Sequence, residues 1–352
     1  MVIGTAVLGT GAPAAPAPTQ TIQVGTAKAT AVTLRAAPAV GSLELAVTSG
    51  ASVAEVRNQL AQSQSQAANL GLLGSALVGE QCDGKEATVR EEQLPHPIRV
   101  DNREGDAALE DAGVPLAGST LSGIYQQVRA SAQPLSEAIT TTGQAELAGL
   151  LQLRGGRATA VSEVVDGGAA RVAHATVTFD LELPGVLSLS GLRWDAFHRT
   201  GTEPDAHAAF TIGSASLLGV PVPTEGLPAT DVLAQLNPVL STLGVTILPP
   251  VVERFTEPAD LVRVTPMRIR FSESPVGALL LGPVLDATRQ LRDDAANTLV
   301  ETDCHFAAVI LVTEVLLGQA SGTGSMNVDL GGAEALTGLE AVASPIVGIP
   351  PL

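Results

Sequence analysis

The stretch LAGLLQLRGGR at residues 147–157 recurs as LPGVLSLSGLR at residues 183–193. Both copies fit the pattern L-x-G-[LV]-L-x-L-x-G-x-R, and they start 36 positions apart. Between them, residues 174–181 alternate apolar and polar side chains, which is typical of a half-buried β-strand. Successive strands with glycines between them predict an antiparallel meander of long strands.

The glycines of the repeat have a predicted role of their own. Glycine at the third and ninth positions of the pattern can supply tight bends or β-bulges that curve the sheet. Two copies are too few for a solenoid, so the pattern indicates duplication of a hairpin unit. Further alternating segments at residues 21–47, 245–248 and 262–271 predict additional strands.

Two amphipathic helices are predicted in the C-terminal part. Thr230 can cap the first, which is stopped by Gly244, and Ser274-Pro275 has the cap-plus-proline signature of the second. Their apolar stripes comprise Val232, Leu233, Leu236, Val239, Leu240 and Leu243, and then Leu280, Val284, Ala287, Leu291 and Ala295. The predicted fold class is therefore α+β and β-dominated, with a long curved antiparallel meander packed against the two helices.

The chain divides into three predicted parts. Residues 1–20 are a leader or the remnant of a signal peptide, and residues 333–352 are a flexible Gly/Pro-rich tail. Residues 21–332 form a single β-rich domain. Within it, residues 83–119 are acidic and interrupted by prolines, and they are expected to form a polar surface excursion.

Composition narrows the classes of function. The net charge of −17 argues against nucleic acid as a partner, because phosphate binding needs a basic surface. No stretch reaches the length of about 18 apolar residues that a membrane-spanning helix needs. Aromatic residues make up only 2% of the chain, so Val, Leu, Ile and Ala must fill the interior.

Export is predicted from the N-terminus. A short apolar run at residues 2–8 precedes two Ala-Pro-Ala triplets, which resemble the small-x-small pattern of a signal-peptidase site. The alternative is a disordered Ala/Pro leader. The expected location is therefore secreted or at the cell surface.

The two cysteines, Cys82 and Cys304, belong to no metal-binding spacing. In a reduced cytosol they would be inert core residues, whereas in an oxidised compartment they would pair. A disulfide that closes so long a loop is worth about 4–5 kcal/mol in the chain-entropy model. With export, we expect the Cys82–Cys304 disulfide.

No motif predicts an enzyme, a cofactor or a metal. An Asp/His pair could suggest hydrolysis, with His198 following Asp195 and His207 following Asp205, but no nucleophile elbow accompanies either. Solvated histidines at strand edges are the default interpretation. The acidic stretch 101–111 could offer oxygen ligands to calcium, but its spacing does not match an EF-hand loop, and such loops are usually only solvated.

The helical stripes leave two alternatives open. They either pack on the concave face of the meander as ordinary core, or they leave a tube for an acyl chain. In the second case the apolar ligand would be lined by Leu236, Leu240, Leu280, Val284 and Leu291.

Six short segments carry a family resemblance: GLRW (191–194), RTG (199–201), GVP (219–221), VTPMRI (264–269), GPVL (282–285) and DCHF (303–306). In these segments the chain resembles secreted proteins of high-GC Gram-positive bacteria of the "choice-of-anchor P" kind. The resemblance implies a cell-surface protein, export and a structural disulfide. It implies no activity.

The expected function is therefore that of a non-enzymatic extracellular or cell-envelope protein, acting as a structural or assembly component. Its partners would be other cell-envelope proteins or copies of itself, joined through an exposed apolar strand edge. The alternative is a carrier that binds a lipid or another apolar ligand between the curved sheet and the helices.

Overall fold

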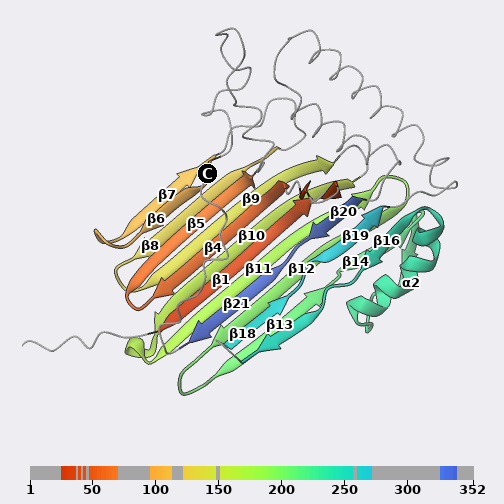
Figure 1. Cartoon of the computed structure of the whole chain (residues 1–352). Helices are drawn as coiled ribbons and strands as arrows, with labels where there is room; N and C mark the ends of the chain where they lie inside the picture. Colours follow the sequence, from red (N-terminus) through yellow and green to blue (C-terminus); the bar gives the residue numbers. More distant parts are fainter. Residues whose placement is uncertain are drawn as a thin grey trace, which may run out of the picture.

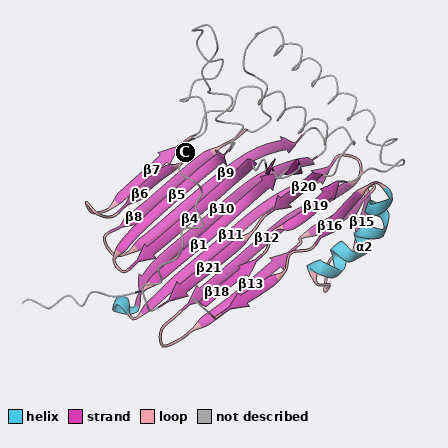
Figure 2. Cartoon of the chain, viewed as in Figure 1, coloured by secondary structure: helices cyan, strands magenta, loops and turns pink. Residues whose placement is uncertain are grey.

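The computed structural model describes residues 25–36, 39–40, 43–44, 47–69, 96–112, 122–147, 151–256, 260–271 and 326–338. Strands dominate this part of the chain (Figure 2). They form two large antiparallel sheets, of ten and nine strands, and a small ladder of β2 (Ala39–Val40) with β3 (Leu43–Glu44).

The ten-stranded sheet is built from segments far apart in the sequence. Its strands are β6 (Ile98–Asp101), β5 (Leu60–Asn69), β4 (Val47–Arg57), β1 (Thr26–Ala36), β20 (Met326–Leu330), β21 (Ala333–Gly338), β19 (Met267–Phe271), β18 (Asp260–Val264), β16 (Val245–Leu248) and β17 (Val252–Phe255). β20 and β21 follow one another along the same side of β1, separated by Gly331 and Gly332. β19 and β18 lie beside them in the same way, and so do β16 and β17. Each of these three pairs therefore acts as one long strand with an interruption.

The nine-stranded sheet follows the chain almost in order. Its strands are β7 (Ala107–Asp111), β8 (Tyr125–Ser131), β9 (Leu135–Leu147), β10 (Leu151–Val165), β11 (Ala170–Leu183), β12 (Leu187–Arg199), β13 (Asp205–Thr211), β14 (Ser214–Leu217) and β15 (Val220–Val222). A single 3₁₀ turn, η3 (Asp166–Gly168), joins β10 to β11. The predicted antiparallel meander is present in this sheet.

The repeat decides where the meander bends. Gly185 has a φ of 72° in the β11–β12 turn, whereas Gly155 and Gly191 each have a φ of 64° inside a strand. The pairing register shifts beside both of these internal glycines, which marks a bulge. The predicted roles of these three glycines as bends and bulges are confirmed, and Gly149 lies outside the described residues.

The two sheets stack face to face, with their strands running in nearly the same direction (Figure 1). Alanines fill much of the space between them, including Ala29 and Ala31 of β1 and Ala158 and Ala160 of β10, all of which are fully buried. Such small side chains let the two layers approach closely. Trp194 and Leu192 of β12 belong to the same hydrophobic core as these alanines.

Buried hydroxyl groups also join the two layers. Thr140 of β9 lies 2.8 Å from Ser52 Oγ and 2.6 Å from Ser65 Oγ, and it donates a hydrogen bond of 3.0 Å to the carbonyl of Ala51. In the opposite direction, Ser52 donates to the carbonyl of Ala158 at 3.0 Å. These polar side chains face the interior because main-chain carbonyls of the opposite sheet are within hydrogen-bond reach.

The predicted packing of the meander against two helices is wrong. The face of the meander is covered by the ten-stranded sheet, and the described residues contain one α-helix, α2 (Ala229–Thr242). α2 lies at one side of the sandwich and packs beside β16 (Figure 1). The prediction failed because the covering strands come from both ends of the chain, and their pairing leaves no local periodic signal.

The first predicted helix does form, with a different start. Pro228 precedes the first turn and gives no side-chain cap, while Thr230 lies inside the helix. Val232, Leu233, Leu236 and Leu240 are buried, as the stripe predicts, and so is Leu243 just after the helix. Val239 of the same stripe is 38% exposed, so the prediction is wrong at that residue. The second predicted helix lies outside the described residues.

Several segments bear on the predicted division into parts. β6 and β7 lie within the predicted polar excursion, and β21 starts the predicted tail yet pairs with both β1 and β18. The predicted leader at residues 1–20 lies outside the described part. Among the described residues, no helix has the length and hydropathy needed to cross a bilayer.

Candidate functional site: a polar cluster on the outer face and an apolar side

Three neighbouring strands of the nine-stranded sheet place a group of polar side chains on its outer face. Side chains alternate between the two faces of a strand, so Asp195 and Arg193 of β12 point outward, while Trp194 between them is buried. The β11–β12 register sets Thr176 opposite Asp195 and His174 opposite Phe197. β13 adds His207 opposite Phe197 on the other side.

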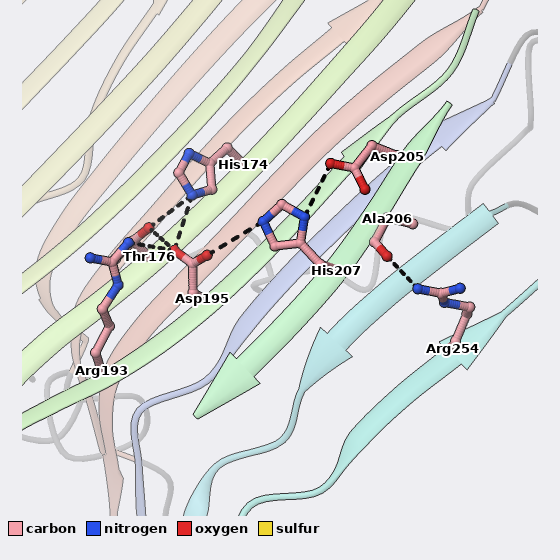
Figure 3. A network of polar contacts seen from close by, with 8 residues as sticks. All are labelled: His174, Thr176, Arg193, Asp195, Asp205, Ala206, His207 and Arg254. Carbon is pink, nitrogen blue, oxygen red and sulfur yellow. Dashed lines mark hydrogen bonds and ion pairs between the residues drawn. The ribbon is translucent and has the colours of Figure 1, made fainter. Parts of the chain in front are cut away.

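Asp195 is the centre of this cluster (Figure 3). Its Oδ1 accepts hydrogen bonds from Thr176 Oγ1 at 3.0 Å and from an Arg193 guanidinium nitrogen at 2.8 Å, and lies 3.1 Å from His174 Nε2. Its Oδ2 lies 4.0 Å from His207 Nε2. The hydrogen bond with His174, aided by Arg193 and Thr176, holds the pKa of Asp195 well below its ordinary value despite partial burial.

The rings of the cluster form a row across three strands. The His174 and Phe197 rings meet edge to face with centroids 5.7 Å apart, and the Phe197 and His207 rings stack at 4.9 Å. His207 Nδ1 also lies 3.3 Å from Asp205 Oδ2. The row is therefore held by ring contacts along its length. The carboxylates of Asp195 and Asp205 lie on two sides of His207 (Figure 3).

The cluster does not have the geometry of a hydrolytic triad. Thr176 Oγ1 and Asp195 Oδ1 both contact the same nitrogen of His174, Nε2, at 3.2 and 3.1 Å. A triad needs the nucleophile and the carboxylate on opposite ring nitrogens, so that one accepts a proton while the other is oriented. Here the hydroxyl of Thr176 donates to Asp195 instead.

The two histidines singled out in the sequence have different positions. His207 pairs with Asp205 as its spacing indicates. His198 lies on the opposite face of β12 from Asp195; it is buried between the sheets, and its Nδ1 lies 2.6 Å from Thr337 Oγ1. Burial lowers the pKa of His198. The cluster instead contains His174, which the sequence reasoning missed as a functional residue.

The acidic stretch 101–111 has main-chain partners. Asp106 Oδ1 accepts from the Ala132 amide at 2.6 Å, and the amide group of Asn102 bonds to the carbonyls of Gln59 and Ser131. In the part of the chain that the structure describes, no three His, Cys, Asp or Glu side chains are grouped so that they could hold a metal ion.

Only two of the five residues predicted to line a ligand tube lie in the described part of the chain. Leu236 and Leu240 are 1% and 0% exposed and belong to the main core together with Leu233 and Ile247. They pack on the protein's own side chains. Leu280, Val284 and Leu291 lie outside the described residues, and so do Cys82 and Cys304 of the predicted disulfide.

A second surface differs in character from the polar cluster. Among the described residues, every large apolar side chain left exposed except Leu109 lies between residues 218 and 255: Leu218, Val220, Leu227, Val239, Leu248, Val251, Val252 and Phe255. These residues belong to β15, α2, β16, β17 and their connections, where the edge strands of both sheets lie. We call this surface the apolar side.

The strand edges of the apolar side are blocked at several points. Asn237 of α2 donates to the carbonyl of Ile247 and accepts from its amide, both at 2.8 Å, which occupies the free edge of β16. Arg254 donates to the carbonyl of Ala206 on β13 (Figure 3). Pro221 interrupts β15, where it removes an amide donor. β17 has no strand beyond it within the described residues.

The fold and surfaces together define a two-layer antiparallel β-sandwich with a self-paired polar cluster on one face. On one side, the edge of β17 carries no further strand among the residues that the structure describes. No protein-family model matches the chain, and no curated protein or solved structure shows a significant match.

Proposed function

We propose that the chain is a non-enzymatic protein of the cell surface or extracellular space that acts as a structural or assembly component. The observation that carries the proposal is the edge of β17, which lies within the apolar side and has no further strand beside it in the described part of the chain. The chain as a whole has a net charge of −17. An exposed strand edge flanked by apolar side chains is a template for pairing with another strand.

The polar cluster supports the same function indirectly. The neighbours of Asp195 lower the pKa of its carboxyl group, and the hydroxyl of Thr176 donates a hydrogen bond to that carboxylate. These side chains therefore fasten β11, β12 and β13 to one another and stiffen the face of the sandwich. A stiff sandwich whose β17 edge carries no further strand within the described residues suits a component that is built into a larger assembly.

The test is retention of a tagged chain in the envelope fraction of its native host. Val252 and Phe255 are 54% and 41% exposed, so replacing both with lysine (Val252→Lys with Phe255→Lys) leaves the core intact. Leu248→Lys is the matched control, because Leu248 is 40% exposed on the half of the same edge that α2 covers. We expect the double variant to be released into the soluble extracellular fraction and the control to be retained.

Two results would overturn the proposal. One is retention of the double lysine variant at the level of the unmodified chain. The other is lipid bound stoichiometrically to the chain in native mass spectrometry of protein purified from the host, which would support the alternative, a carrier of an apolar ligand. The packing of Leu236 and Leu240 in the core does not favour that alternative.

A further inference from the structure

The main chain of β17 offers hydrogen-bonding groups at a defined spacing. Thr265 donates to the carbonyl of Val251 at 2.9 Å, and the Val251 amide donates to Thr265 Oγ1 at 2.8 Å. Val251 therefore directs its main-chain groups toward β18. In an antiparallel pair the direction alternates with each residue, so Val252 and Arg254 direct their amides and carbonyls away from the sheet.

The side chains of this edge form a pattern that is nearly symmetric about Glu253. Successive side chains alternate, so Val251, Glu253 and Phe255 share the outer face of the sheet. Val251 and Phe255, two positions before and after Glu253, are 54% and 41% exposed. A two-fold axis through Glu253 would place Phe255 of each copy beside Val251 of the other copy, so that the contact occurs once on each side of the axis.

The charges at the centre are compatible with that axis. Glu253 forms an ion pair with Arg263 on β18, and the Arg263 guanidinium also lies 5.1 Å from the centre of the Phe255 ring. Two Glu253 carboxylates that meet at the axis would therefore each bring their own cation. The resulting row, Arg263–Glu253 followed by Glu253–Arg263 of the second copy, is neutral, although the chain as a whole is strongly acidic.

We infer that the partner of the β17 edge is a second copy of this chain. The two β17 strands pair antiparallel about Glu253, with Val252 of one copy hydrogen-bonded to Arg254 of the other, and this joins the two ten-stranded sheets into one. The inference rests on the proposed function, since it names the partner in an assembly. The inference goes beyond the proposed function because it specifies which strand pairs, in which register and with which symmetry.

The register can be tested with one cysteine. In this pairing, residue 253 faces residue 253 of the second copy in a non-hydrogen-bonded pair, with Cα atoms about 4.5 Å apart. That separation lies within the range a disulfide bridges. We expect purified Glu253→Cys to form a covalent dimer under mild oxidation, visible on a non-reducing gel. Leu248→Cys, at a residue that is 40% exposed on the half of the edge that α2 covers, would remain at the level of the unmodified chain.

Sedimentation velocity of the purified full chain provides a second readout. We expect a concentration-dependent dimer for the unmodified chain and for Leu248→Lys. The variant with Val252→Lys and Phe255→Lys should show at least a tenfold weaker association. The contacts of Phe255 with Val251 of the second copy are lost, and the lysine at position 252 lies beside Arg254 of the second copy. Far-ultraviolet circular dichroism of each variant checks that the fold is retained.

The outcomes separate this inference from the proposed function. A chain that stays monomeric at high concentration, while the double lysine variant still loses retention in the host envelope, overturns the second copy as partner and leaves the assembly function standing. A covalent dimer formed equally by Glu253→Cys and Leu248→Cys overturns the register. Loss of both dimerisation and retention in the double variant supports both proposals.

Discussion

The buried hydroxyl of Thr140 provides the sharpest test of how the two sheets are held together. Thr140 is fully buried, and its Oγ1 contacts Ser52, Ser65 and the carbonyl of Ala51, all on the opposite sheet. Thr140→Val keeps the shape of the side chain and removes the hydroxyl. Each buried hydrogen bond contributes about 1 kcal/mol net, and a buried group left without a partner costs about 1–3 kcal/mol. We therefore expect the free energy of unfolding to fall by about 2–4 kcal/mol.

The control is Thr178→Val, a threonine on the outer face of β11. Since Thr178 is partly exposed, the loss of its hydroxyl should change the free energy of unfolding by less than about 0.5 kcal/mol. The assay is urea denaturation followed by circular dichroism, with equal slopes required for the comparison. A Thr140→Val variant as stable as Thr178→Val would refute the idea that hydroxyl groups join the two layers.

Two further predictions concern single residues. Gly331→Ala should destabilise the protein far more than Gly219→Ala: both glycines have positive φ values, 72° and 78°, but a Cβ at residue 331 would lie 2.3 Å from Trp194 Cε2, whereas residue 219 has nothing within 4 Å. Equal melting temperatures for the two variants would contradict the steric argument. Asp195→Asn should lower stability at pH 7. Because the folded pKa of Asp195 lies below the unfolded value of 3.8, its contribution is complete above that pH and is lost as the pH falls through the folded pKa. The difference in the free energy of unfolding between the unmodified chain and Asp195→Asn should therefore begin to shrink as the pH falls below about 3.8. A difference that stays constant with pH would contradict the assignment.

The polar cluster could not be assembled from the sequence because one bulge changes the register. Leu183 pairs with Leu187 across the β11–β12 turn, and continuing that register would set His174 opposite Ala196. The irregularity beside Gly191 shifts the partner of His174 to Phe197. A shift of one residue moves every later side chain to the other face, so the contacts of Asp195 depend on the bulge.

The sequence by itself determined the local elements of this protein. The repeat predicted the hairpins of the meander and the glycines that bend it, and the stripe of Val232, Leu236 and Leu240 predicted α2. These features depend on neighbours in the chain, so their periodicity is visible in the sequence.

Only the tertiary structure decided what covers the meander and which polar residues lie inside. β1 pairs with β20 and β21, about three hundred positions away along the chain, and no local pattern specifies that choice. Ser52 and Thr140 would be expected in solvent from their polarity alone, yet they are buried, because the carbonyls of the opposite sheet satisfy them. The position of β17 at the end of the described strand order likewise follows from the tertiary structure, and it is this edge that carries the proposed function.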